Sequence, residues 1–437
     1  MKIFYIPIGV GTYHMETAEA AVEASKTLLR TIDPEILCPE QLLLSSDAVA
    51  DFVGGQDPDL VILQNVTFAN AAYTTEVAAR VRCPIVLWTL REPQGPAGGR
   101  LKLNALTGAF SSAHTIHQFR AERPIFVFGG PEEEEVRHIL AEAVSAAKVK
   151  ADLAHLKLAA IGHTPQGFGF GRALDSELTR TFGCSLVSIE ARELIEKARR
   201  MEPEESPVPL PGMEQIPEQN QIDFGRLYAA YQSWVRENGI GALASRCWPD
   251  FFVDYGTPVC GVLSLLNAEG IPSACECDIY GALSMYLGQA FTGAASFFGD
   301  PVAIDEENNT LTFWHCGMAS CSLAREETGA AIGVHPNRKI GPTMEFGCKP
   351  AEKVTILRVG RDSDGSFRFF IAEGEALDLP KQYLGTSVVV RTQTKVEDMV
   401  RFLIGHGYEP HYAVIYGDAA DGLEMLAHML GLKVDRL

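Results

Sequence analysis

Residues 273–300 read SACECDIYGALSMYLGQAFTGAASFFGD. Apolar residues recur every three or four positions between Ile279 and Ala290, and this spacing predicts a helix. Short runs of small and apolar residues flank the helix and end at Glu276 and Asp300, 24 positions apart. The stretch is therefore expected to fold as strand, helix and strand. A crossover of this length joins parallel strands and is almost always right-handed, so both carboxylates should lie at the carboxyl edge of neighbouring strands.

Two carboxylates at that edge predict a metal site. Open α/β sheets bind their ligands at the carboxyl ends of the strands. Glu276 and Asp300 held side by side would repel each other, and the pKa of at least one of them would rise unless a cation lay between them. The pattern of residues therefore favours a bound cation.

The composition indicates a multidomain globular protein. The chain of 437 residues exceeds the size at which a single core stops growing, and 46% hydrophobic with 21% charged residues excludes a disordered chain. A net charge of −19 argues against nucleic acid and anionic membranes as partners. The first residues lack the features of a signal peptide, and no apolar run is long enough to cross a bilayer, so a cytoplasmic location is expected.

The cysteines predict neither disulfides nor zinc. The chain has 10 cysteines with no C-x-x-C pair, which disfavours a disulfide framework. Four of them could be imagined as a zinc site, although structural zinc sites usually show tighter paired spacing; these are Cys275, Cys277, Cys316 and Cys321.

The order of patterns predicts two Rossmann-like α/β domains followed by a mixed α+β domain that is largely antiparallel. Residues 1–150 alternate strand and helix patterns, which indicates a parallel sheet covered on both faces. A second α/β domain is expected over residues 151–291. Residues 292–437 are rich in strand patterns, including a predicted antiparallel hairpin of Lys353–Val359 and Ser366–Ala372.

Two irregular segments of the second domain are expected to be loops. The glycine-rich turn at residues 162–169 permits close approach to a ligand, or is merely a tight turn. The segment from Glu202 to Gln219 contains five prolines and several acids, which predicts an exposed irregular excursion.

The segment from Ala274 to Asp300 resembles the metal-binding segment of the L-fucose isomerase family. The likeness rests on a small residue before the glutamate, the Glu-x-Asp pattern at residues 276–278, the helix end at residues 291–293 and the aspartate 24 positions after the glutamate. Residues 410–417, followed by a Leu- and Met-rich helix, are similar to the family segment that supplies a third ligand. Looser similarities to the amino-terminal domain shared by fucose and arabinose isomerases extend the resemblance over most of the chain. The chain is shorter than the best-known bacterial fucose isomerases, so the preferred sugar stays open.

The resemblance implies a metal-dependent aldose–ketose isomerase acting on a fucose- or arabinose-like sugar. Glu276 from the second domain would bind one divalent cation together with Asp300 and His411 from the C-terminal domain. Mn²⁺ fits two carboxylates and one imidazole, with Co²⁺ and Mg²⁺ as alternatives. Glu276 and Asp300 would also move the proton between carbons 2 and 1 through an enediol. A homo-oligomer, hexameric or trimeric, is implied as well.

Five further residues are predicted to bind the substrate, each with a structural role as the alternative. Asp278 could serve only as the N-cap of the helix. A tryptophan could stack on the sugar, across a subunit boundary for Trp88 as the family implies, or lie in the core. The basic pair Arg338 and Lys339 could select an anionic substituent. The five predicted residues are Trp88, Trp248, Asp278, His315 and His335.

Two other functional classes compete with this hypothesis. A non-catalytic sugar-binding protein would also place tandem α/β domains around a cleft, but the missing export signal counts against it. An epimerase or lyase that uses the same metal and enediol chemistry is poorly separated from an isomerase by sequence.

Overall fold

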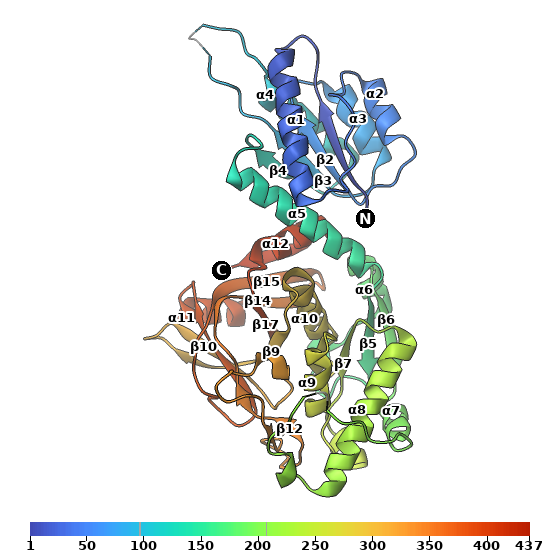
Figure 1. Cartoon of the computed structure of the whole chain (residues 1–437), viewed down its shortest axis with the longest axis vertical. Coiled ribbons are helices and arrows are strands. Elements are labelled where there is room, and N and C mark those ends of the chain that lie inside the picture. Colours follow the sequence, from blue (N-terminus) through green and yellow to red (C-terminus); the bar gives the residue numbers. More distant parts are fainter. Residues whose placement is uncertain (96–97, 207) are drawn as a thin grey trace. The chain divides into compact units, whose positions relative to one another are not determined.

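The computed structural model describes residues 1–95, 98–206 and 208–437, and the chain forms two compact units (Figure 1). Unit 1 comprises residues 1–151 and unit 2 comprises residues 152–437. The helix α5 (Glu134–Leu153) runs across the division between them. The boundary predicted after residue 291 falls inside unit 2.

Unit 1 is a parallel sheet with helices on both faces, as the alternating pattern predicts. The sheet order is β1-β2-β3-β4, and all three pairings are parallel. One face packs on α2, α3 and α4, while on the other face Gln64 of β2 hydrogen-bonds Ser25 of α1. The elements are β1 (Ile3–Ile8), α1 (Met15–Ile32), α2 (Ser46–Val53), β2 (Leu60–Asn65), α3 (Ala71–Arg80), β3 (Ile85–Thr89), α4 (Ala105–Phe119) and β4 (Ile125–Phe128).

Unit 2 begins with a second parallel sheet, of order β6-β5-β7-β8. Its last strand, β8, is short and ends directly before Glu276. The elements are β5 (Lys157–Ile161), α6 (Asp175–Phe182), β6 (Ser185–Ile189), α7 (Ala191–Ala198), α8 (Glu218–Asn238), β7 (Ala242–Ser245), α9 (Cys260–Ala268), β8 (Ser273–Cys275) and α10 (Ile279–Thr292).

The rest of unit 2 is built on an eight-stranded sheet that closes on itself. Six strands follow the order β16-β10-β9-β17-β14-β15, and β15 pairs again with β16. Every pairing in this ring is antiparallel, so the six strands form a barrel, and β13 and β18 add to it as parallel strands. The predicted hairpin is β14 and β15 of this barrel.

The elements of this part are β9 (Ser296–Asp305), β10 (Thr310–His315), β11 (Ile332–Gly333), β12 (Thr343–Met344), β13 (Phe346–Gly347), β14 (Ala351–Arg361), β15 (Phe367–Ala376), β16 (Thr386–Thr392), α11 (Val396–Gly405), β17 (Tyr412–Tyr416), α12 (Ala420–Met429) and β18 (Lys433–Arg436).

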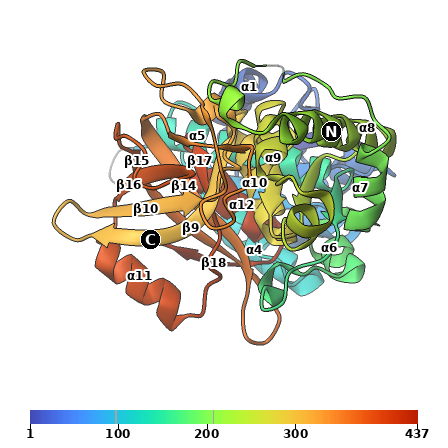
Figure 2. The same cartoon turned by 90° about the horizontal axis from the view of Figure 1, so that it is seen from below.

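The helix α10 lies between the parallel sheet and the barrel, and this corrects the predicted crossover. It contacts β5, β7 and β8 on one side and β9, β14 and β17 on the other. In Figure 2, α10 lies beside the labelled barrel strands β9, β14 and β17. The strands before and after the helix therefore belong to different sheets, and β9 is antiparallel to both of its neighbours. The prediction of neighbouring parallel strands is wrong because the helix buries two faces. The second face carries small residues, including Gly281 and Gly288, that admit the barrel strands closely.

The segment Glu202–Gln219 contains one short turn at Met213–Gln215 before α8 begins at Glu218, and residue 207 lies outside the described part. Within residues 1–95, 98–206 and 208–437, no helix combines the length and hydropathy needed to cross a membrane.

Candidate active site

A strained turn places Glu276 at the end of β8. Glu276 and Cys277 have φ angles of 59° and 54°, in the left-handed region that non-glycine residues rarely adopt. Two such residues cost about 1–3 kcal/mol each, and such strain clusters at functional sites. The turn is held because the Cys277 amide donates to the Ser245 carbonyl at 3.0 Å. The side chain of Glu276 accepts a hydrogen bond from Nε1 of Trp248 at 3.3 Å.

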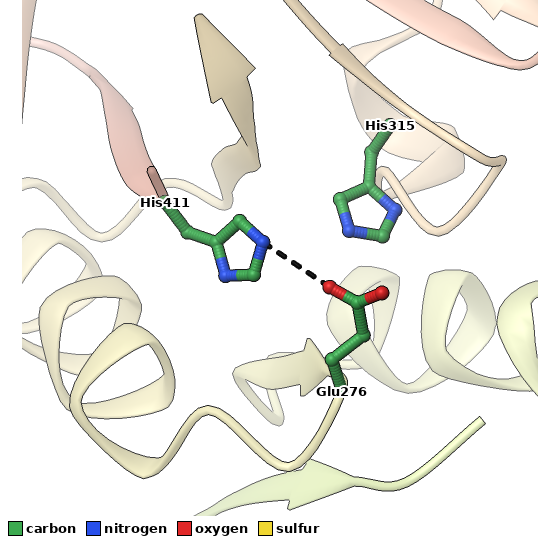
Figure 3. Close-up of side chains that lie close together, drawn as sticks. All are labelled: Glu276, His315 and His411. Atoms are coloured by element: carbon green, nitrogen blue, oxygen red, sulfur yellow. Dashed lines mark ion pairs between the residues drawn. The ribbon is translucent and has the colours of Figure 1, made fainter. Parts of the chain in front are cut away.

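The imidazole of His411 brings the predicted carboxylates together. Its Nε2 atom lies 3.2 Å from Oε2 of Glu276 and 3.3 Å from Oδ1 of Asp300 (Figure 3 shows the first contact). His411 directly precedes β17, and β17 pairs with β9, so that Tyr412 faces Gly299 across the ladder. The barrel register therefore fixes His411 beside Asp300, while the turn after β8 delivers Glu276 from the parallel sheet.

Asp278 is both the N-cap of α10 and the partner of His411. Its Oδ1 accepts from the Gly281 amide at 2.9 Å, which is the predicted capping contact. Its Oδ2 lies 3.0 Å from Nδ1 of His411 and 2.6 Å from a guanidinium nitrogen of Arg358 in β14. All three side chains are buried. A carboxylate bound to Nδ1 fixes that nitrogen as the protonated one and turns Nε2 toward Glu276 and Asp300.

The buried charges of the site stabilise one another. Burial would lower the pKa of His411, but hydrogen bonds to Asp278, Asp300 and Glu276 raise it well above its usual value. Burial opposes ionisation of Glu276 and Asp300, yet their hydrogen bonds to the charged ring of His411 lower the pKa of both carboxyls. Both groups are thus carboxylates at neutral pH, as cation ligands or general bases must be.

His315, at the end of β10, completes a cluster of possible ligand atoms. Glu276, His315 and His411 each offer one atom within 4.8 Å of the others (Figure 3). Nδ1 of His315 accepts a hydrogen bond from the Cys316 amide at 2.9 Å, so the proton of the neutral ring sits on Nε2. Burial lowers the pKa of His315 and keeps the ring neutral. Its Nε2–H is therefore suited to donate to a substrate oxygen and not to ligate a metal.

A pocket of about 170 Å³ opens beside these residues. It includes three of the predicted substrate-binding residues, Trp248, His315 and His335, together with Glu276. Asn337 and Arg338 also line it. The pocket therefore combines one acid, hydrogen-bond donors and an aromatic ring in one cavity, which is the usual make-up of a site for a small polar ligand.

Trp88 belongs to β3 of unit 1 and is not among the residues that line this pocket. Its side chain is 0% exposed, and Nε1 donates to the Gly129 carbonyl at 2.9 Å. Its ring also packs near Tyr5. These contacts correspond to the core alternative, and its predicted role in sugar binding stays a prediction.

Sequence reasoning did not anticipate three side chains at the site. Phe168 and Phe170, at the end of the glycine-rich turn, pack against the ring of His411 with centroids 6.4 and 5.4 Å away. Phe168 also contacts Trp248 edge to face. Arg358 is fully buried and makes the ion pair with Asp278 described above. The only sequence signal for Arg358 was a charged residue between apolar neighbours in a predicted strand.

Comparisons with known proteins identify the family of the chain. The family model for the L-fucose isomerase C-terminal domain matches residues 337–437, which include His411. The chain is 54% identical over 441 residues to a sulfoquinovose isomerase of Clostridium sp. (strain MSTE9), covering 99% of this chain and 98% of that protein. It is 36% identical to the sulfoquinovose isomerases of Priestia aryabhattai and Alkalicoccus urumqiensis, covering 99% of this chain and 98% and 99% of those proteins. The chain therefore belongs to the L-fucose isomerase family and is an aldose–ketose isomerase, an intramolecular oxidoreductase.

Proposed function

We propose that this protein isomerises sulfoquinovose, a hexose with a sulfonate on carbon 6, to its ketose, with a divalent cation bound by Glu276, Asp300 and His411. The observation that carries the chemistry is the convergence of both carboxylates on Nε2 of His411, at 3.2 and 3.3 Å. We take the proposed substrate from the names of the relatives, which match the chain over nearly its full length. It differs from the fucose- or arabinose-like sugar expected from the sequence.

The donor set fits a divalent cation. Asp278 keeps a proton on Nδ1 of His411, so a cation that displaces the proton from Nε2 would meet the lone pair of that nitrogen beside Glu276 and Asp300. Two carboxylate oxygens with one imidazole nitrogen suit Mn²⁺, whereas zinc is selected by thiolate-rich donor sets. The proton on Nε2 of His315 leaves that ring as a donor to the substrate. We therefore propose Mn²⁺ with three protein ligands.

The side chains divide the proton transfer between them. A bound divalent cation would polarise the carbonyl of the open-chain sugar and make the neighbouring C–H more acidic. Glu276, held through Oε1 by Trp248, removes the proton from carbon 2 and passes it to the oxygen on carbon 1, which gives the enediol. Asp300 takes the proton from the hydroxyl on carbon 2 and delivers it to carbon 1, which gives the ketose. The Nε2–H of His315 donates to a sugar oxygen and orients the chain between the two carboxylates.

The deciding experiment follows sulfoquinovose by NMR in D₂O with Mn²⁺ present. The proposal predicts formation of the ketose with deuterium incorporated at the exchanging carbon. Glu276→Gln should bind the sugar but lose both exchange and isomerisation by at least about 100-fold, the scale of a general base. The exposed Glu306→Gln is the matched control and should retain full activity.

Three results would contradict parts of the proposal. Exchange without a ketose product would favour an epimerase. Full activity of metal-free protein would show that the reaction needs no cation. If Glu276→Gln were as active as Glu306→Gln, Glu276 would not be the general base.

A further inference from the structure

Arg338 lines the same pocket as Glu276 but lies on a different element. It sits in the turn between His335 and Ile340, where the backbone closes through a hydrogen bond from the His335 amide to the Ile340 carbonyl at 2.9 Å. An aldose reacts at carbons 1 and 2, beside Glu276. A substituent on carbon 6 is at the opposite end of the open chain. A residue that recognises that substituent must therefore line the same pocket on an element other than the turn that carries Glu276, as Arg338 does.

The charged guanidinium of Arg338 is available to bind an anionic ligand. Among the residues that the structure describes, no carboxylate lies within ion-pair distance of it and no acceptor bonds its side chain. Arg246, also near Trp248, is by contrast paired with Asp250 at 2.7 Å and hydrogen-bonded to the Trp248 carbonyl. In a chain of net charge −19, an unpaired cation beside an acidic site is the feature that can offset the repulsion of an anionic substrate.

Two aromatic rings hold the guanidinium in place. Its central carbon lies 5.4 Å from the ring centroid of Trp248 and 5.7 Å from that of Phe252. Contacts of arginine with aromatic faces leave the N–H groups at the edge of the guanidinium plane free for hydrogen bonds. Those N–H groups form a fork that matches two oxygens of a sulfonate.

His335 fixes the turn that carries Arg338. Its Nδ1 accepts hydrogen bonds from the amides of Asn337 and Arg338, both at 3.3 Å, and its carbonyl accepts from the Lys339 amide at 2.8 Å. Its ring meets Phe252 edge to face with centroids 4.9 Å apart. His335 thus joins the turn to the same aromatic ring that contacts the guanidinium.

We propose that Arg338 recognises the anionic substituent on carbon 6, with His335 as the residue that positions it. The inference rests on the proposed function, since it names the group that selects the sulfonated sugar. The proposal assigns this role to Arg338 and not to the adjacent Lys339, because Lys339 does not line the pocket.

The test compares sulfoquinovose with quinovose, the same sugar without the sulfonate, using Mn²⁺-loaded protein. Arg338→Gln should lower the ratio of kcat/KM between the two sugars about 10- to 100-fold, mainly through KM for sulfoquinovose, as expected for loss of a charge-assisted pair. Arg338→Lys should recover part of this ratio, since it keeps the charge without the fork. Lys339→Gln is the neighbouring control and should match the wild type.

His335 is tested by a conservative rescue. His335→Ala should raise KM for sulfoquinovose with little change in kcat, and His335→Asn, whose side-chain oxygen can accept the two amides, should restore part of the loss. An equal effect of His335→Ala on both sugars would indicate a purely structural role and overturn the positioning assignment.

The outcomes separate the two proposals. If the wild type isomerises sulfoquinovose and Arg338→Gln keeps the wild-type ratio, the inference fails and the proposed function stands. If the wild type isomerises uncharged sugars and not sulfoquinovose, both fail.

Discussion

Oδ2 of Asp278 lies 3.0 Å from Nδ1 of His411 and 2.6 Å from the guanidinium of Arg358, so one carboxylate oxygen is shared by two buried cationic groups. Burial alone would raise the pKa of Asp278, but Arg358 and His411 lower it far below the usual range. A permanently charged Asp278 therefore stands behind the imidazole that faces Glu276 and Asp300.

Asp278→Asn separates the charge of this residue from its capping role. Asparagine caps helices as well as aspartate does, so the start of α10 should persist. Loss of the charge should weaken Mn²⁺ binding about 10- to 100-fold, because the orientation of His411 is no longer enforced. It should also lower the free energy of unfolding by about 3 kcal/mol, because Arg358 loses the nearer of its two buried carboxylate partners, Asp278 and Glu409. Calorimetric titration and urea denaturation measure the two effects. Unchanged Mn²⁺ affinity in a folded variant would refute this role.

Removal of the metal is expected to abolish turnover reversibly. Dialysis against a chelator should inactivate the enzyme, and Mn²⁺ should restore it. Mn²⁺ at 100 times its dissociation constant should raise the free energy of unfolding by about 2.7 kcal/mol if it binds only the folded state. His411→Gln should remove this increase, whereas the exposed His155→Gln should keep it. Equal stabilisation of both variants would exclude His411 as a ligand.

The close packing of α10 on the barrel predicts opposite effects for two glycine substitutions. A Cβ on Gly281 would lie 2.4 Å from Cε2 of Phe298 in β9, so Gly281→Ala should destabilise the protein by about 1–3 kcal/mol. Gly405, at the end of α11, has no atom within 4 Å of its Cβ position. Gly405→Ala should be neutral or stabilise by up to about 1 kcal/mol. Thermal denaturation of both variants decides this, and equal shifts would contradict the packing argument.

His335 predicts a loss of stability in mild acid. Burial, together with the charge of Arg338, lowers its pKa from 6.5 to about 4. Below pH 6.5 the unfolded chain takes up this proton before the folded chain does, so the folded state loses stability as the pH falls from about 6.5 to about 4. His335→Asn should lose less stability than the wild type over this interval, as measured by urea denaturation at several pH values. Parallel curves for the two proteins would show that His335 does not contribute.

Local patterns could predict the helix and strands around Glu276 but not the sheet that each strand joins. The spacing of apolar residues from Ile279 to Ala290 correctly indicates one buried face. The second buried face consists of small residues such as Gly281 and Gly288, which give no hydrophobic period. The barrel strand that follows was therefore assigned to the wrong partner.

Pairings between distant segments were equally inaccessible to the sequence. The hairpin of β14 and β15 is local and was predicted, whereas closure of the barrel requires β16 to return to β15. Arg358 was missed for the same reason, because its partner Asp278 is 80 positions away. The residues of the candidate site were found through short motifs, and the contacts that orient them depend on the three-dimensional fold.

The separation of the site residues along the chain has a consequence for biosynthesis. Glu276 emerges from the ribosome 135 residues before His411, and Asp300 precedes His411 by 111 residues. The nascent chain thus carries both carboxylates long before it carries the imidazole, and β17 must join the barrel before Nε2 can face them. The catalytic centre is therefore expected to be among the last features to form during translation, so a stalled or prematurely released chain without β17 would be inactive even with its parallel sheet intact.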